Sequence, residues 1–255
     1  MNQRPKLSVI IPAYNEEDRI RPTLESIDSY LEKQPYSYEI IVVSDGSTDR
    51  TVEVVKEYQR TTVENLKLNA NPVNHGKGFA VKDGVGMAEG EYILFMDADN
   101  ATKINEIEKF WPWFEKGYDV VIGSRHVKGN VEVKRSFLRG LFSKASSLLI
   151  QIILLPGIKD SQCGFKAFKR DVAERLFSVQ TLMRWGFDFE ILAVARYWGL
   201  KIKEVPVNWA HIGASRLRFV HAVLRTLKEL FIVKWNLMTG KYKKYDFEKY
   251  RRHHQ

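Results

Sequence analysis

The chain has 255 residues, of which 44% are hydrophobic and 28% charged, so it is long enough for one large or two small folded units and is not intrinsically disordered. Its net charge of +9 favours anionic partners such as nucleic acid, phosphorylated substrates or an acidic membrane surface. The single cysteine, Cys163, excludes a disulfide within these residues, offers no second thiol for a zinc knuckle, and fits a reducing compartment.

The first half of the chain alternates apolar runs with amphipathic stretches. The pattern predicts strands at 6–14, 38–47, 65–71 and 92–99, and helices at 16–34, 48–60 and 77–90. Near-continuous apolar strands are typical of parallel sheets that are buried on both faces. We therefore predict a doubly wound α/β sheet, whose ligands bind at the carboxyl ends of the strands. Asp45, Asp97 and Asp99 lie at such ends.

The pattern of apolar residues is less regular in the second half, which we interpret as C-terminal additions to the same domain. We expect a strand at 119–126, an amphipathic helix at 135–154, a buried helix at 185–199, a late strand at 201–211 and an apolar-basic helix from Phe219. The predicted catalytic domain spans 1–240, with a nucleotide-binding half at 1–125, an acceptor-binding half with interfacial helices at 126–240, and a basic tail at 241–255.

No segment is typical of a signal peptide or a membrane span. The opening residues 1–17 contain only a short apolar run. The most apolar stretch, 146–158, is shorter than the roughly 20 residues that a span needs. We therefore expect a protein that touches a membrane without crossing it.

Asp97 and Asp99 are two residues apart at the end of an apolar strand, so their side chains point the same way. Two carboxylates at close range repel each other unless a cation lies between them. Mg²⁺ or Mn²⁺ suits such a pair, because a hard cation prefers oxygen ligands and keeps substrate phosphates in its shell. Taken alone, one Asp-x-Asp in a chain of this length is about what chance supplies; its place at a strand end carries the metal hypothesis.

Several segments occur in an order and spacing that resemble family 2 glycosyltransferases of GT-A fold. They are VIIPAYNEE at 9–17, VVSDGSTDRT at 42–51, HGKGFAVKDGV at 75–85 and FMDAD at 95–99. The segments GSRH, DSQCGFKAFKRDVAERLF, RWGFDFEILAVA and VNWAHIGASRLR are similar to those of dolichyl-phosphate β-glucosyltransferases, and less closely to dolichyl-phosphate mannose synthases. The resemblance covers about residues 7–240. It implies a Rossmann-like, mostly parallel mixed sheet flanked by helices.

The resemblance implies a nucleotide site at the first strand ends. Its residues would be Pro12, Ala13, Tyr14, Glu16, Asp45, Lys77 and Asp97. The Asp45 carboxylate would accept a hydrogen bond from a base N–H, and Lys77 would lie near the nucleotide between two glycines. Ordinary structural roles remain open: Pro12 ends a strand, Asp45 caps a turn, and the glycines form a loop.

Asp97 and Asp99 would bind the metal that bridges the donor diphosphate and offsets charge on the leaving nucleoside diphosphate. Mannose synthases tend to carry a glutamine two residues after the second aspartate, whereas this chain has Ala101. A third ligand is therefore left open between water and Asn100.

The implied acceptor is a polyprenyl phosphate, which is largely dianionic at neutral pH and needs cationic positioning more than a general base. The candidate cations are Arg125, Arg135, Arg139 and Arg216, because guanidinium groups bind phosphate bidentately. Asp188 would contact the donor sugar or the acceptor; a buried ion pair with Arg184 is the alternative.

The predicted activity is inverting transfer of a hexose, glucose being favoured, from UDP-glucose to a polyprenyl phosphate. The predicted location is the cytoplasmic face of a membrane, reached through residues 135–154 and the basic tail; packing of 135–154 on the core is the alternative. Rival predictions are GDP-mannose as donor, another UDP-sugar, or a hydroxyl acceptor with Asp188 or Glu190 as base. Nucleic-acid binding is disfavoured because the basic residues are spread along the chain, and a non-catalytic nucleotide-sugar sensor is a further alternative.

Overall fold

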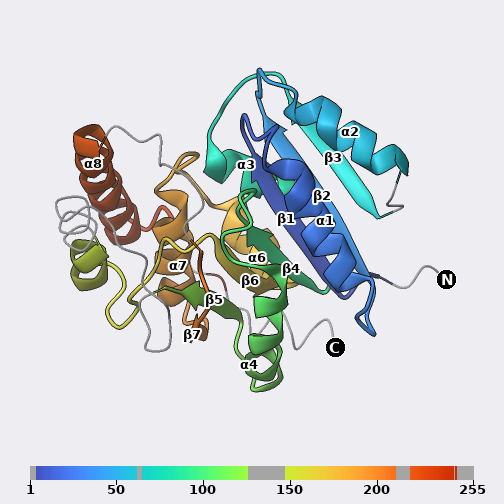
Figure 1. Cartoon of the computed structure of the whole chain (residues 1–255). Helices are drawn as coiled ribbons and strands as arrows, with labels where there is room; N and C mark the ends of the chain where they lie inside the picture. The colour runs from blue at the N-terminus through green and yellow to red at the C-terminus, as the bar shows by residue number, and fades with distance from the viewer. Residues whose placement is uncertain (1–3, 62–64, 126–146, 211–218, 244, 246–255) are drawn as a thin grey trace.

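The computed structural model describes residues 4–61, 65–125, 147–210, 219–243 and 245, with only the backbone of 219–224. A single seven-stranded sheet in the order β3-β2-β1-β4-β6-β5-β7 runs through the molecule and carries helices on both faces (Figure 1). Four of its ladders are parallel, and the two that involve β6 are antiparallel. The predicted α/β class and mostly parallel mixed sheet are confirmed.

From β1 to β4 the elements follow one another in the order that the alternating pattern predicts. The strands are β1 (Leu7–Ala13), β2 (Tyr38–Asp45), β3 (Leu66–Asn71), β4 (Tyr92–Met96), β5 (Val120–Ser124), β6 (Phe165–Lys169) and β7 (Ile202–Pro206). The helices are α1 (Ile20–Leu31), α2 (Thr51–Thr61), α3 (Lys77–Met87), the 3₁₀ helix η1 (Ile104–Lys109), α4 (Trp111–Glu115), α6 (Arg170–Ser178), α7 (Phe187–Tyr197) and α8 (Phe219–Met238). Residues 147–153 form a further helix.

Two apolar clusters sandwich the sheet, because successive side chains of each strand alternate between its faces. On β1, Ile10 belongs to the cluster that contains the buried sides of α3, α6, α7 and α8, whereas Val9 and Ile11 belong to the cluster under α1, α2 and α4. Nine of the eleven residues of α7 are buried, which confirms the prediction of a buried helix there.

Strand β6 lies between β4 and β5 and has no counterpart in the sequence prediction. Phe165–Lys169 is short and places Lys166 among apolar residues, so neither a continuous apolar run nor a clean alternation marks it. It pairs antiparallel with both neighbours, with Met96 opposite Phe165. Its first residue therefore lies at the same sheet edge as the last residues of β1, β2 and β4.

The predicted amphipathic stretch 135–154 is described only from residue 147. Within the 147–153 helix, Ile150 is buried, whereas Leu148, Leu149 and Ile152 are exposed. The described part of the apolar stripe therefore lies on the surface. Among the described residues, none of the helices combines the length and apolarity that crossing a membrane requires.

Candidate active site

The paired aspartates lie where β4 ends against the start of β6. The Asp97 backbone N–H donates to the Gly164 carbonyl at 3.1 Å, and the Asp99 Oδ1 accepts from the Ala101 N–H at 3.0 Å. Asn100 has a left-handed backbone with φ of 54°, which turns the chain sharply behind Asp99. A methyl group at position 164 would overlap the Asp97 carboxylate, so Gly164 is the residue that admits this side chain.

Lys77, the first residue of α3, reaches across to the aspartates. Its Nζ lies 2.5 Å from Asp97 Oδ1. Burial alone would lower the pKa of Lys77, but the carboxylates of Asp97, Asp188 and Asp99 outweigh burial and raise it. The lysine and three aspartates therefore form one electrostatic cluster with a permanently charged ammonium group.

Asp99 is the member of the pair that is difficult to ionise. Burial and the negative charge of Asp97 raise its pKa, and the hydrogen bond from Ala101 offsets this only in part. The neighbouring Asn100 Oδ1 is buried and has no hydrogen-bond partner among the described residues. Two repelling carboxylates and an unpaired amide oxygen are hard donors that fit a Mg²⁺ or Mn²⁺ ion. Within the described part of the chain, no three His, Cys, Asp or Glu side chains gather as a metal-binding group.

The predicted nucleotide-binding residues at the end of β1 lead into a loop that is hydrogen-bonded to the loop after β2. Pro12 and Ala13 are buried at the end of β1, and Tyr14 is exposed. The Glu16 carboxylate forms an ion pair with the Arg19 Nε at 2.6 Å, and the Glu16 N–H donates to Thr51 Oγ1 at 2.8 Å. The Thr48 N–H donates to Asn15 Oδ1 at 2.8 Å. The loops after β1 and β2 therefore form one hydrogen-bonded rim.

Asp45 is buried at the end of β2 and supports the loop that carries Lys77. Its carboxylate accepts from the His75 N–H at 3.0 Å and from the Gly76 N–H at 2.6 Å. The predicted hydrogen bond to a base stays a prediction. What the structure shows is that Asp45 fixes the two backbone amides directly before Lys77.

The segment 181–185 holds the same loop from the other side. The Gly78 N–H donates to the Arg184 carbonyl at 3.2 Å, and the Phe79 N–H donates to the Met183 carbonyl at 2.9 Å. Trp185 is 48% exposed, and the Lys77 Nζ lies 5.7 Å from its ring centroid. An exposed indole therefore stands at the rim of the charged cluster.

The carboxylates of Asp188 and Glu190, in the first turn of α7, are both already bound to other groups of the protein. Asp188 is 3% exposed and forms an ion pair with the Lys166 Nζ at 2.5 Å. The expected alternative of a pair with Arg184 is wrong, because Arg184 is exposed and donates to Asn74 Oδ1 at 3.4 Å.

Glu190 is fully buried and accepts four hydrogen bonds that hold the 181–185 segment. The donors are the Thr181 N–H and hydroxyl at 2.9 and 2.5 Å, the Leu182 N–H at 2.8 Å and the Tyr242 hydroxyl at 2.6 Å. Glu190 therefore links α7 and the chain beyond α8 to the segment that contacts the Lys77 loop.

Arg125, which follows β5, binds Asp160 in a two-pronged contact. Its Nε and Nη2 lie 2.8 Å from the two carboxylate oxygens, so the guanidinium is held in a fixed orientation. The other three predicted acceptor-binding residues, Arg135, Arg139 and Arg216, lie outside the described residues.

Sequence reasoning missed three side chains of this region: Lys166, Trp185 and Arg19. A lysine inside the apolar segment 165–168 was the available signal for Lys166, because a buried charge needs a partner. Arg19, whose charge acts on Asp99, sits in a polar stretch that gave no signal.

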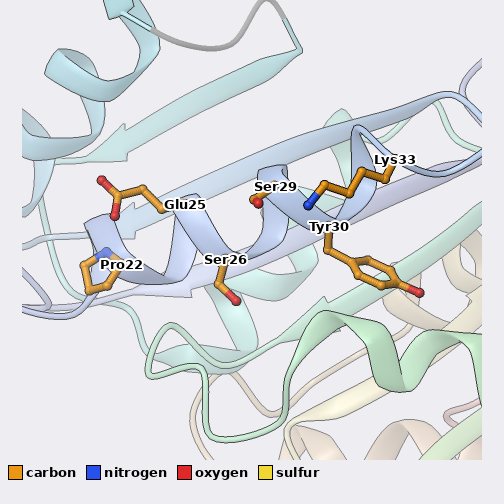
Figure 2. A pocket seen from close by; sticks show the side chains of 6 residues that line it. All are labelled: Pro22, Glu25, Ser26, Ser29, Tyr30 and Lys33. Carbon is orange, nitrogen blue, oxygen red and sulfur yellow. The ribbon is translucent and has the colours of Figure 1, made fainter.

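Two other features have no assigned part in this chemistry. Cys163 is buried, and burial raises the pKa of its thiol to about 12, so it is not a thiolate nucleophile at neutral pH. A shallow hollow lies along α1, lined by Pro22, Glu25, Ser26, Ser29, Tyr30 and Lys33 (Figure 2). All but Lys33, which follows the helix, belong to α1, and none belongs to the aspartate cluster.

Comparison with known proteins gives the same assignment along most of the chain. The family described as "Glycosyl transferase family 2" matches residues 8–177. A dolichyl-phosphate beta-glucosyltransferase of Dictyostelium discoideum is 37% identical over 93% of this chain and 76% of its own length. The Homo sapiens protein of the same name is 36% identical over 92% of this chain and 76% of its own.

Solved structures share the fold at lower identity. Mannosyl-3-phosphoglycerate synthase from Rubrobacter xylanophilus superposes with a TM-score of 0.70 at 18% identity, covering 95% of this chain and 77% of that one. Glucosyl-3-phosphoglycerate synthase from Mycobacterium tuberculosis, in complex with Mn²⁺, UDP-glucose and phosphoglyceric acid, gives a TM-score of 0.64 at 20% identity, covering 95% and 82%. Together with the sheet order and the aspartate pair, these matches show that the chain belongs to glycosyl transferase family 2 and is a glycosyltransferase of GT-A fold.

Proposed function

We propose that this protein transfers glucose, with inversion, from UDP-glucose to dolichyl phosphate or another polyprenyl phosphate. The observation that carries the proposal is the match along more than nine-tenths of the chain to proteins named dolichyl-phosphate beta-glucosyltransferase. The proposed reaction is a direct displacement at the anomeric carbon of the sugar. An acceptor phosphate oxygen bonds to the anomeric carbon, the bond from that carbon to the donor diphosphate breaks, and UDP leaves with the electron pair.

The donor diphosphate would lie between Lys77 and the paired aspartates. Lys77 is held on both sides, by Asp45 through the His75 and Gly76 amides and by the 183–184 backbone. A fixed ammonium group stabilises charge that develops on the leaving diphosphate, because it needs no reorganisation during the reaction. The rim formed by Pro12, Ala13, Tyr14 and Glu16 would enclose the nucleoside.

A divalent cation would be held by Asp97 and Asp99, with the Asn100 amide oxygen as a further donor. When bound, such an ion supplies Lewis-acid stabilisation of the departing diphosphate. The raised pKa of Asp99 supports this assignment, since a nearby cation favours the ionised form of a carboxyl that burial and Asp97 disfavour. The solved Mn²⁺ complex with UDP-glucose belongs to a protein of the same fold.

A phosphate acceptor fits the finding that the carboxylates of Asp188 and Glu190 already bind other groups of the protein. A hydroxyl acceptor needs a general base, whereas a phosphate monoester with its second pKa near 6 is already a nucleophile at pH 7. Asp188 is paired with Lys166, and Glu190 already accepts four hydrogen bonds, so neither is a free base. Arg135, Arg139 and Arg216 remain the proposed phosphate ligands; Arg125 would act from its fixed position on Asp160.

Because the acceptor is a membrane lipid, we place the protein peripherally on the cytoplasmic face of a membrane. The exposed apolar side chains of the 147–153 helix support that placement.

A donor and acceptor screen tests the proposal. Purified protein with Mn²⁺ or Mg²⁺ would be given UDP-glucose, UDP-N-acetylglucosamine or GDP-mannose, each with a polyprenyl phosphate or with 3-phosphoglycerate. We expect UDP release and a glucosylated lipid, detected by mass spectrometry, only with UDP-glucose and the polyprenyl phosphate.

Asp99→Asn should abolish this turnover, whereas Asp171→Asn, which removes a carboxylate on α6 away from the cluster, should preserve it. Turnover with GDP-mannose would replace the donor, and turnover with 3-phosphoglycerate alone would replace the acceptor class.

A further inference from the structure

The exposed large apolar side chains gather on two helices. Of the eleven that are exposed among the residues with described side chains, seven belong to these helices: Leu148, Leu149, Ile152, Phe231, Ile232, Trp235 and Met238. Both helices turn their other sides to the same core cluster, through Ile150 on one and Leu230 and Val233 on the other. On α8 these residues line one groove, and contiguous apolar surface of this kind marks a docking site, whereas single exposed apolar residues are common.

The outer face of α8 has the regular spacing of an interfacial helix. Phe231, Trp235 and Met238 are separated by four and three residues, so they share one side of the helix. They are 63%, 65% and 71% exposed, and a nearly wholly apolar groove runs between them. Leu230 and Val233, on the opposite side, are fully buried.

The charge on this face has one sign. Lys228 and Lys234 line the same groove, and residues 230–238 contain no Asp or Glu. Glu229, the nearest carboxylate, is 7% exposed and points toward the core side. Lysines that border an aromatic and aliphatic face complement anionic lipid headgroups above hydrocarbon.

The buried side of α8 contacts the segment that borders the charged cluster. Gly186 packs so closely against the Glu229 carboxylate that a methyl group at position 186 would overlap it. Gly186 directly follows Trp185, whose ring lies next to Lys77. Phe231 follows Glu229 by two residues, about half a helical turn, so the exposed face lies on the side of α8 opposite to this contact.

We propose that the outer face of α8, formed by Lys228, Phe231, Lys234, Trp235 and Met238, docks on the surface of an anionic bilayer. This inference rests on the proposed function for one point, that the lipid substrate enters from that bilayer beside Trp185. A second copy of the chain is disfavoured as the occupant, because a twofold contact would oppose like lysine charges.

Vesicle flotation tests the docking without reference to turnover. The full chain would be mixed with vesicles of phosphatidylcholine alone or with about 30% phosphatidylserine. We expect binding to the anionic vesicles, reduced at least about tenfold in Phe231→Glu/Trp235→Glu, since two large apolar groups no longer leave water. Lys228→Gln/Lys234→Gln should bind several-fold more weakly and lose most of its salt dependence.

The matched control is Tyr197→Glu, which adds a carboxylate at an exposed aromatic residue on α7 and should float like the wild type. Undiminished flotation of Phe231→Glu/Trp235→Glu, or equal binding to neutral vesicles, would overturn the proposal. A dimer in solution that this double variant dissociates would assign the face to a second copy instead. Circular dichroism and thermal melting check that each variant is folded.

Turnover with two acceptors separates this inference from the proposed function. Phe231→Glu/Trp235→Glu should keep near-wild-type turnover with geranyl phosphate, which is water-soluble, and lose it with a long polyprenyl phosphate in vesicles. Absence of wild-type turnover with either acceptor, together with normal flotation, would reject the proposed acceptor and leave the docking face intact. Equal loss with both acceptors would show that the face acts on the site itself and would contradict docking as its role.

Discussion

At the scale of single residues, Asp99 is both a proposed metal ligand and a carboxyl group whose ionised form is unfavourable in the folded protein. Its raised pKa means that the folded protein holds a proton on Asp99 more tightly than the unfolded chain does. The free energy of unfolding therefore falls as the pH rises from the ordinary aspartate value of 3.8 through the raised pKa. Above the raised pKa, the ionised form of Asp99 destabilises the fold unless a cation is bound.

Asp99→Asn should consequently raise the melting temperature at pH 7 while it abolishes turnover. The expected rise is about 2–4 °C, the change that roughly 1 kcal/mol of stability makes in a domain of this size. Mn²⁺ with UDP should stabilise the wild type but not the variant. A ligand stabilises only a folded protein that binds it, and the variant lacks one of the two proposed metal-binding carboxylates. Differential scanning fluorimetry at pH 4, 5.5 and 7 measures both effects. A melting temperature lower than that of the wild type at pH 7 would contradict the electrostatic argument.

Lys77 should be required for catalysis more than for folding. Lys77→Met removes the only side-chain cation that lies within 4 Å of Asp97 among the described residues. We expect kcat/KM for the donor to fall about 10²–10³-fold, the usual effect of removing one preorganised group that stabilises a leaving charge. Lys82→Met on the same helix is the matched control. Comparable losses in the two variants would show that the effect comes from α3 as a whole.

At the scale of elements, the Lys166–Asp188 pair joins β6 to α7. Lys166→Met leaves a buried carboxylate without its partner and should cost about 3–5 kcal/mol of stability. Replacing both residues, as Lys166→Met/Asp188→Leu, should restore most of this, because a buried pair contributes little net stability over apolar side chains of similar size. Urea denaturation of the two single variants and the double variant measures the cycle.

The double variant also decides the role of Asp188. Because Asp188 is 3% exposed and its carboxylate is paired with Lys166, we expect the folded double variant to retain turnover within about tenfold of the wild type. A loss greater than 10³-fold in a protein of normal stability would instead support the direct substrate contact that the sequence predicts for Asp188.

Glu190 should act as a positioning residue for the 181–185 segment. Glu190→Gln turns an amide donor toward other donors and should cost about 1–3 kcal/mol, the penalty for buried groups left without partners. The donor KM should rise more than kcat falls, because the segment holds the backbone of Gly78 and Phe79. Tyr242→Phe should couple with it in a double-mutant cycle. Glu174→Gln, at an exposed ion pair on α6, should change both constants little.

The sequence predicts elements best where one chemical pattern dominates. The apolar runs of β1, β2 and β4 locate the sheet and its acidic edge, and Ile20, Leu24, Ile27 and Leu31 give the buried side of α1. Strand β6 and the α6 helix escape prediction, because the position of β6 depends on pairing with β4 and β5, which are far away in sequence. The spacing shows that the side chains of Asp97 and Asp99 point the same way. It does not show that Lys77 forms an ion pair with Asp97 or that Lys166 forms one with Asp188, because these partners are far apart in sequence.

At the scale of the whole molecule, the family match ends within α6 although the fold continues. Residues after 177 supply β7, the parallel partner of β5, and α7, with its nine buried residues. A fragment of residues 1–177 should therefore fail to fold, because it exposes the β5 edge and a large part of the core cluster. Size-exclusion chromatography and circular dichroism compare the fragment with the full chain. A monomeric fragment with a cooperative melting transition would contradict this expectation.

The antiparallel strand β6 also limits how this enzyme can be rebuilt. It is hydrogen-bonded to β4 on one side and to β5 on the other, so two ladders join the first half of the sheet to the second. A chimaera that exchanges whole halves between related enzymes must re-form both ladders with foreign partners. Exchange of the loops at the sheet edge leaves the ladders intact. Specificity for a new acceptor should thus be transferable by grafting the segments after β5 and around 181–186, and not by swapping domains.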